Sequence, residues 1–222
     1  MTSNAPGYSQ SDGRFMARAL ELARARLGKV APNPAVGCVI VREGVVAGEG
    51  ATGDGGRPHA EELALGAAGE RARDATVYIS LEPCNIRSSG ALSCSQLLIE
   101  ARVGRVVIAC EDPHPHGAHG VSRLGAAGVE VMLGVMRAEA EALNCGFFKT
   151  VRTGRPWLAT DADTSAYDAG FDLGRNETFE EALDRLGRNG LTRIFVLPGT
   201  PLAAQLRARG LVDEDRSDGN RQ

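Results

Sequence analysis

The stretch TVYISLEPC, residues 76–84, runs from an apolar segment of strand length directly into Pro83-Cys84. Val77, Tyr78 and Ile79 are β-branched or aromatic, and such residues favour strands. We therefore predict a strand over residues 76–81 and expect Cys84 to begin the next helix. A cysteine placed immediately after a strand draws attention to the chemistry of this segment.

Strands and helices alternate on both sides of this stretch, which predicts βαβ units and a largely parallel sheet covered on both faces. The first two expected strands are separated only by the turn Glu43-Gly44, so we expect them to pair antiparallel. The expected helices are residues 14–27, 59–68, 92–101, 121–127 and 137–143, and the other expected strands are 36–41, 45–48, 105–110 and 129–132.

The pattern changes after residue 150. We expect a strand at 157–160, a weakly patterned acidic stretch at 161–174, and a helix at 178–186. Thr178 and Glu181 have the spacing of a capping box at the start of that helix. A short strand at 194–197 and a helix at 201–209 follow. The expected organisation is a flexible tail at 1–12, a main domain at 13–150, a small α/β segment at 151–212 and a polar tail at 213–222.

Composition excludes several classes of function. The chain has 28 acidic and 25 basic residues and a net charge of −3, so nothing indicates bulk binding of nucleic acid or of a membrane surface. No apolar run reaches the length of a membrane span and the N-terminus lacks a secretory signal, which favours a cytoplasmic protein. Five cysteines, an odd number, argue against a disulfide framework and leave buried, catalytic or metal-binding thiols.

One histidine and two cysteines are candidate metal ligands. His59 opens a predicted helix, Cys84 follows a strand, and Cys94 lies ten residues further along the chain. Such a set supplies three ligands to a tetrahedral Zn²⁺ and leaves the fourth position to water, which is the catalytic pattern. Glu61, two residues after His59, is placed to act as a proton shuttle. H-x-E followed by Pro-Cys is typical of zinc deaminases, although the spacing between the two cysteines is longer here.

A second interpretation treats Cys84 and Cys94 as ordinary buried thiols and His59 as a capping residue. It leaves the placement of all three unexplained. We expect the other cysteines to lie in the core, since they occur in apolar surroundings; they are Cys38, Cys110 and Cys145. Three histidines in a Pro- and Gly-rich stretch favour an exposed loop over a second metal site; they are His114, His116 and His119. His114 follows a strand end, where sites of α/β folds gather, so a contact with substrate is expected of it.

Longer motifs identify a family. They are PNPAVGCVIV at 32–41, GRPHAE at 56–61, LEPC at 81–84 and TGRP at 153–156. Over about residues 14–160 the chain resembles the deaminase domain of the bifunctional deaminase–reductase of riboflavin biosynthesis (RibD type). The resemblance implies a cytidine-deaminase-like three-layer α/β/α sandwich with a mixed, mostly parallel five-stranded sheet. It further implies one zinc on His59, Cys84 and Cys94, a proton shuttle at Glu61 and a substrate contact at Asn33.

The same resemblance implies a hydrolytic deaminase that converts the diaminopyrimidine ribosylamino 5′-phosphate precursor of riboflavin to the aminouracil, with release of ammonia. It also implies a homo-oligomer. Two alternatives stay open at this stage: a zinc deaminase of another nucleobase or nucleotide, and a catalytically inactive, zinc-stabilised partner protein. Retention of Glu61 weighs against the inactive protein, because a structural zinc needs no proton shuttle.

The chain departs from the family where substrate and cofactor are bound. The segment between Cys84 and Cys94 lacks the two histidines and the Thr-Pro-Pro of the common form, so Arg87 and Ser88 become candidates to hold a phosphate. Thr52 stands where many relatives have histidine, and we expect it to contact substrate. The family continues into an NADPH-dependent reductase, but its Glu-Gly-Gly loop reads Leu197-Pro198-Gly199-Thr200 here. Neither NADPH binding nor reductase activity is therefore expected.

Overall fold

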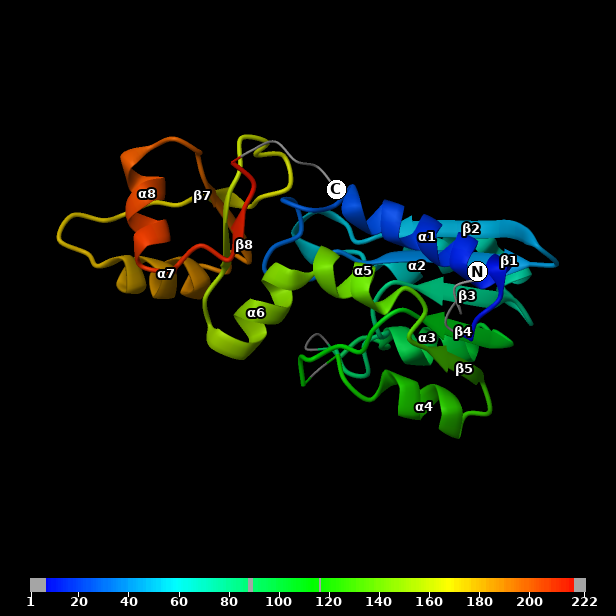
Figure 1. Cartoon of the computed structure of the whole chain (residues 1–222). Coiled ribbons are helices and arrows are strands. Elements are labelled where there is room, and N and C mark those ends of the chain that lie inside the picture. The colour runs from blue at the N-terminus through cyan, green and yellow to red at the C-terminus, as the bar shows by residue number, and fades with distance from the viewer. Residues whose placement is uncertain (1–6, 88–89, 116, 218–222) are drawn as a thin grey trace. The chain divides into compact units, whose positions relative to one another are not determined.

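The computed structural model describes residues 7–87, 90–115 and 117–217, and these form two compact units (Figure 1). The first unit contains Ala35–Leu143 together with the residues up to Arg26, and the second contains Leu27–Pro34 and the residues from Asn144 onward. The division after Leu143 corrects the boundary expected at residue 150. The helix Cys145–Thr153 follows this boundary and packs closely within the second unit. A Cβ added at its Gly146 would lie only 2.5 Å from the carbonyl oxygen of Thr192.

The first unit is built on a five-stranded sheet with the order β2-β1-β3-β4-β5. β1 pairs antiparallel with both β2 and β3, whereas β3, β4 and β5 are parallel. All strands except β1 therefore run in one direction, which confirms a mixed, mostly parallel sheet and the expected antiparallel hairpin. The bounds are β1 Gly37–Arg42, β2 Val45–Ala51, β3 Thr76–Ile79, β4 Arg105–Ile108 and β5 Glu130–Leu133.

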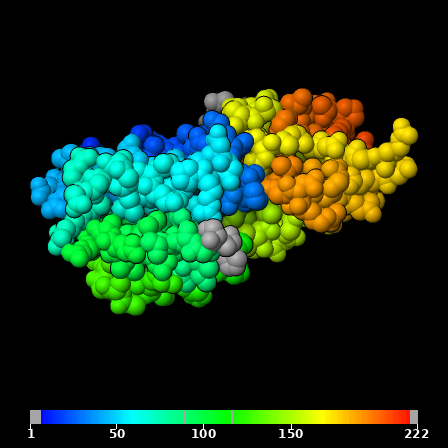
Figure 2. Space-filling model, turned by 180° about the vertical axis from the view of Figure 1, so that it is seen from behind, coloured from blue at the N-terminus to red at the C-terminus, as the bar shows by residue number. Residues whose placement is uncertain are grey.

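Helices cover both faces of this sheet and complete a three-layer sandwich. Helices α1 and α5 lie on one face, and α2, α3 and α4 lie on the other (Figure 1). Cyan and green residues, the colours of the chain from α2 to α4, cover the face seen from behind in Figure 2. The bounds are α1 Gln10–Arg24, α2 Ala60–Ala68, α3 Cys94–Glu100, α4 Gly120–Ala126 and α5 Arg137–Leu143, with short 3₁₀ turns at Asp54–Gly56 and Gly69–Ala72.

Small residues set the distance between α2 and the sheet. A Cβ added at Gly50 in β2 would lie 2.2 Å from the carbonyl oxygen of Ala60, and one added at Gly48 would lie 2.3 Å from that of Ala64. Ala60 and Ala64 are themselves fully buried in the core on this face. The helix therefore rests almost directly on the backbone of β2, and this contact fixes the height of its N-terminus.

The flexible tail expected over residues 1–12 is wrong from Ser9 onward. Ser9 caps α1: its Oγ accepts the backbone N–H of Asp12 at 3.1 Å, and the Asp12 carboxylate accepts the N–H of Ser9 at 3.2 Å. Asp12 is buried and also accepts from Arg105 (2.7 Å) and from the hydroxyl of Tyr78 (3.0 Å). A capping box and a buried ion pair thus order a segment whose polar composition indicated a tail.

The second unit holds a four-stranded parallel sheet with the order β7-β8-β6-β9. The capping box expected from Thr178 and Glu181 is confirmed at the start of α7. Residues 213–217 of the expected polar tail are part of the fold, because β9 pairs with β6 and Asp213 donates its N–H to the carbonyl of Leu158 at 2.8 Å. The bounds are α6 Cys145–Thr153, β6 Trp157–Thr160, β7 Ala169–Gly170, α7 Phe179–Arg188, β8 Arg193–Val196, α8 Pro201–Ala208 and β9 Glu214–Asp215.

Buried aliphatic side chains form a core of its own in this second unit, centred on Leu158, Leu183, Ile194 and Leu206. Among the helices of the described residues, none is long and apolar enough to cross a membrane.

Candidate metal and active site

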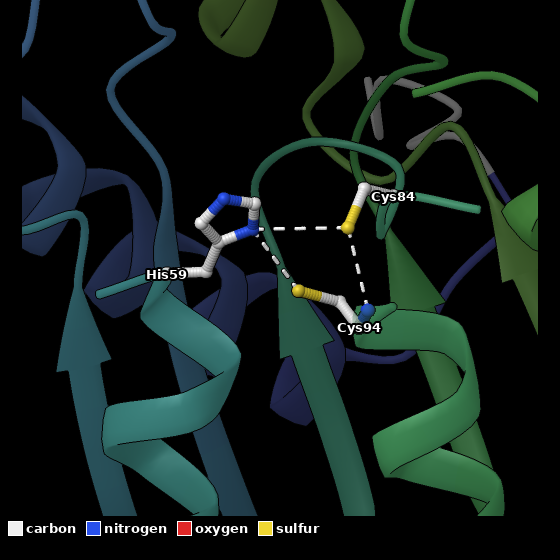
Figure 3. A group of neighbouring side chains, drawn as sticks. All are labelled: His59, Cys84 and Cys94. Atoms are coloured by element: carbon white, nitrogen blue, oxygen red, sulfur yellow. Dashed lines mark hydrogen bonds between the residues drawn. The ribbon is translucent and has the colours of Figure 1, made fainter. Parts of the chain in front are cut away.

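Three side chains from separate elements of the first unit point toward one another (Figure 3). His59 immediately precedes α2, Cys94 is the first residue of α3, and Cys84 lies in the connection after β3. The Nδ1 atom of His59 is 3.2 Å from Sγ of Cys94 and 3.8 Å from Sγ of Cys84. All the ligand atoms of the trio lie within 4.8 Å of one another, which is close enough to share one metal ion.

Backbone hydrogen bonds hold the two cysteines together. Cys84 does not begin a helix as expected. Its carbonyl instead accepts from the N–H of Ser95 (3.2 Å) and from the hydroxyl of Ser95 (3.1 Å). The N–H of Cys94 donates to Sγ of Cys84 at 3.3 Å. An N–H at the start of a helix favours negative charge on sulfur, so the fold prepares this thiol to become a ligand.

A hydrogen bond between the two thiols shifts their pKa values in opposite directions. The hydrogen bond from Cys94 holds the pKa of the Cys84 thiol well below its usual range, and His59 acts in the same direction. The same contact with Cys84, together with burial, raises the pKa of the Cys94 thiol. Two cysteine sulfurs, which bind zinc as thiolates, and one imidazole nitrogen lie within reach of one point. These are donors that Zn²⁺ prefers, so the residues present fit this metal.

Glu61 is buried beside the trio, with 3% of its surface exposed. It is the second residue of α2. Burial raises the pKa of its carboxyl group, and the neighbouring His59 opposes that rise. Within the described residues only the trio qualifies as a metal-ligand group, and Glu61 is not part of it. A carboxyl group with a raised pKa next to such a site is suited to transfer protons near neutral pH.

Arg87 is buried next to the candidate metal ligands. Its side chain is 5% exposed, with Nη1 donating to Oε1 of Glu62 at 2.9 Å and Nη2 donating to Sγ of Cys94 at 3.2 Å. The guanidinium thereby contacts Glu62 and the candidate metal ligand Cys94. Its expected contact with a phosphate stays a prediction.

Thr52 also has structural partners. Its Oγ1 accepts the N–H of Val36 at 2.9 Å, and its own N–H donates to the carbonyl of Val36 at 2.9 Å. The residue is 4% exposed and ties the end of β2 to the start of β1. Its expected contact with substrate stays a prediction.

The remaining candidates are placed as follows. Asn33 belongs to the second unit, where its N–H donates to the carbonyl of Val30, and its substrate contact stays a prediction. His114 lies half-buried after β4 and donates its N–H to the carboxylate of Asp112 at 2.8 Å. Ser88 and His116 lie outside the described residues.

Two carboxylates that sequence reasoning missed organise the site. Glu82 is buried and accepts the N–H of Asp112 (3.2 Å) and the N–H of Val121 (2.9 Å). It thus ties the connection after β4 to the start of α4. Glu62 accepts the backbone N–H of His59 at 2.7 Å. Glu62 is the third residue of the helix, the position of the glutamate in a capping box. The spacing from His59 to Glu62 could therefore have predicted this contact from the sequence.

Two of the three cysteines expected in the core, Cys38 and Cys110, are buried as predicted. Cys145 is only partly buried, and its Sγ accepts a hydrogen bond from Nη1 of Arg193 at 3.1 Å in the second unit.

Comparison with known proteins agrees with this site. Residues 9–110 match the family model of the cytidine and deoxycytidylate deaminase zinc-binding region. The chain is 41% identical over 143 residues to a diaminohydroxyphosphoribosylamino-pyrimidine deaminase of Buchnera aphidicola, covering 64% of this chain and 97% of that protein. The chain belongs to the RibD-type deaminase family.

Larger members of the RibD-type family match the chain over part of their length. It is 48% identical over 148 residues to riboflavin biosynthesis protein RibD of Escherichia coli, which is 66% of this chain and 40% of that protein. The chain thus spans about two fifths of the length of this relative. The solved structure of Acinetobacter baumannii RibD superimposes with a TM-score of 0.77 and 26% identity, covering 93% of this chain and 85% of that one.

Proposed function

We propose that the protein is a zinc-dependent hydrolytic deaminase, with one zinc per chain, that acts on the phosphoribosylated diaminopyrimidine of riboflavin biosynthesis. The observation that carries the proposal is the convergence of His59, Cys84 and Cys94 beside the buried carboxyl of Glu61. The name of the Buchnera deaminase specifies a phosphoribosylamino-pyrimidine, and the name of the RibD relatives specifies riboflavin biosynthesis, so both support the choice of substrate.

Each residue has a distinct role in this reaction. Nδ1 of His59 and Sγ of Cys84 and Cys94 would hold the metal. When bound, zinc supplies Lewis acidity that makes water a nucleophile near neutral pH. A C–O bond forms at the amine-bearing ring carbon and the C–N bond breaks, so water is consumed and ammonia leaves. The Glu61 carboxylate would accept a proton from the attacking water and deliver protons to the ring nitrogen and the departing amine.

The test is to measure zinc content and ammonia release by the purified full chain with a panel of aminopyrimidines that includes the riboflavin precursor. We expect close to one zinc per chain and release of ammonia from the phosphoribosylated precursor. A protein that retains zinc yet deaminates nothing in the panel would contradict the proposal and favour the inactive, zinc-stabilised protein.

One observation favours a second candidate, a deaminase of another nucleobase or nucleotide. The segment between the two cysteines differs from the common form of the family, and its Arg87 is engaged with Glu62 and Cys94. The same panel separates the two candidates, because this one predicts faster ammonia release from a compound other than the riboflavin precursor.

A further inference from the structure

An ion pair between the buried Arg87 and the partly exposed Glu62 contacts the metal-ligand trio. The Arg87 side chain is 5% exposed, and its only carboxylate partner in the described residues is Glu62, at 2.9 Å. Its second terminal nitrogen donates to Sγ of Cys94 at 3.2 Å. Removing a guanidinium from water is costly unless it is paired and hydrogen-bonded, so a buried arginine in this position needs a reason.

The pair links two metal-ligand elements that are distant in sequence. One oxygen of Glu62 accepts the N–H of His59 at 2.7 Å, and the other receives Arg87. A continuous chain of contacts thus runs from the backbone of His59, through Glu62 and Arg87, to the sulfur of Cys94. It connects the start of α2 to the start of α3, where the histidine and the second cysteine are held.

Positive and negative groups alternate along this chain of contacts. One terminal nitrogen of the positive guanidinium donates to the Cys94 sulfur, and the other pairs with the negative carboxylate of Glu62. The pair therefore supplies a charge-assisted hydrogen bond to sulfur without adding net charge to the site. Partners of this kind orient metal ligands and tune how strongly they donate to the metal.

We infer that the Arg87–Glu62 pair is a positioning unit that holds the side chains of Cys94 and His59 in place to bind one metal ion. The inference rests on the proposed zinc site. It adds that tight zinc binding also requires the Arg87–Glu62 pair, which is not among the three ligands. It also assigns Arg87 a different role from the phosphate contact that its residue type suggested.

The experiment measures zinc affinity of the full chain by competition with a chromogenic chelator. We expect Arg87→Met to weaken zinc binding by roughly 10- to 100-fold. Arg87→Lys retains the charge and part of the hydrogen bonding, so it should recover part of the loss. The matched control is Arg123→Met, since Arg123 donates to Asn85 in the same connection at 2.5 Å and should leave zinc affinity within about twofold.

Two further measurements separate positioning from a general effect on folding. In the Co²⁺-loaded protein, the thiolate-to-cobalt absorption band should shift in Arg87→Met and not in Arg123→Met. Glu62→Gln should also weaken zinc binding, and the double variant Glu62→Gln/Arg87→Met should be no weaker than Arg87→Met alone, because both changes break one unit. If Arg87→Met does not fold, Arg87→Lys and Glu62→Gln provide the same test.

Different results would contradict the inference and the proposed function. Unchanged zinc affinity and cobalt spectrum in Arg87→Met, with a raised KM for the phosphorylated substrate alone, would overturn the inference in favour of a phosphate contact. A wild-type protein that binds neither zinc nor cobalt would overturn the proposed function itself.

Discussion

Glu61 is the proposed proton shuttle, and this role would distinguish a deaminase from a protein that only binds zinc. It is buried at the second position of α2 and is not one of the three ligands. We therefore expect Glu61→Gln to retain zinc and to reduce the rate of ammonia release by about 10²- to 10⁴-fold, the usual contribution of a positioned proton carrier. Steady-state ammonia release and metal analysis of the same sample provide the measurement.

Glu70→Gln is the control for this change, because Glu70 is an exposed glutamate in the short turn after α2. It should release ammonia at the wild-type rate. Wild-type activity in Glu61→Gln would contradict the assigned proton transfer, and loss of zinc in that variant would show that Glu61 acts on the metal site instead.

Asp12 is a stability determinant that can be tested through pH. Hydrogen bonds from Arg105, Ser9 and Tyr78 hold the pKa of its carboxyl far below the unfolded value of about 4. Because the folded pKa is depressed, the ionised carboxylate stabilises the fold above ~pH 4, and this contribution is lost as the pH falls toward the folded pKa. We expect Asp12→Asn to lower the free energy of unfolding by about 2 kcal/mol at pH 7.

Urea denaturation at several pH values checks this prediction. The difference between wild type and Asp12→Asn should shrink as the pH is lowered below ~4. The control is Glu130→Gln, because Glu130 is the second partner of Arg105 and is 68% exposed, so its removal should cost less than about 0.5 kcal/mol. A difference that does not depend on pH would show that Asp12 acts by packing and not by charge.

The candidate metal-ligand trio could be predicted from sequence because its residues occur in recognisable motifs, H-x-E and Pro-Cys, and the structure brings the three side chains together. Histidine, cysteine and glutamate occur at the spacing that the chemistry requires. The role proposed for Arg87 could not be predicted, since no motif pairs it with Glu62 and the two side chains meet only in the folded structure. Thr52 illustrates the same limit, because its hydroxyl pairs with the backbone of Val36.

At the scale of elements, the close contact between α2 and β2 determines where His59 stands. Gly50 leaves no room for a side chain below Ala60. We expect Gly50→Ala to lower the free energy of unfolding by about 2 kcal/mol and also to weaken zinc binding, since α2 must move to accommodate the methyl group. Thermal or urea unfolding and chelator competition measure the two effects.

Gly66→Ala, in the same helix, is the matched control. Nothing lies within 4 Å of a Cβ added at Gly66, which is exposed. This change should stabilise the helix by about 0.5–1 kcal/mol and leave zinc affinity unchanged. Equal behaviour of the two variants would show that the contact between α2 and β2 does not position the histidine.

Elements were predictable where the signal lies within the element itself. The capping box at Thr178 and the turn at Glu43-Gly44 are examples, and the positive φ angles of 52° and 78° at the turn match its sequence. The two-residue strands β7 and β9 were missed because they carry no internal pattern. They are strands only because β8 and β6 pair with them.

For the molecule as a whole, the alternation of strands and helices was sufficient to predict an α/β fold. The boundary between the two compact units could not be predicted from it. Helix α6 was absent from the predicted elements. It belongs to the second unit through the close approach of Gly146 to Thr192, a contact between residues 46 positions apart. Periodicity carries no information about contacts at that separation.

The second unit provides the last prediction, which concerns NADPH. Its β8 leads through Leu197-Pro198-Gly199-Thr200 into α8, where a phosphate would be bound by free backbone N–H groups. Pro201, the first residue of α8, has no N–H, and Oγ1 of Thr200 already accepts the N–H of Ala203 at 3.1 Å. We therefore expect no saturable NADPH binding up to roughly 1 mM in a fluorescence titration of the full chain.

Restoring N–H donors at this turn gives the matched comparison. Pro198→Gly with Pro201→Ala adds two backbone N–H groups next to Gly199, and any gain of NADPH binding in that variant would locate the obstacle in the turn. Oxidation of NADPH by the unaltered chain, in the presence of the deaminated product, would contradict the prediction outright. In that case the second unit would bind the dinucleotide through contacts other than the start of α8.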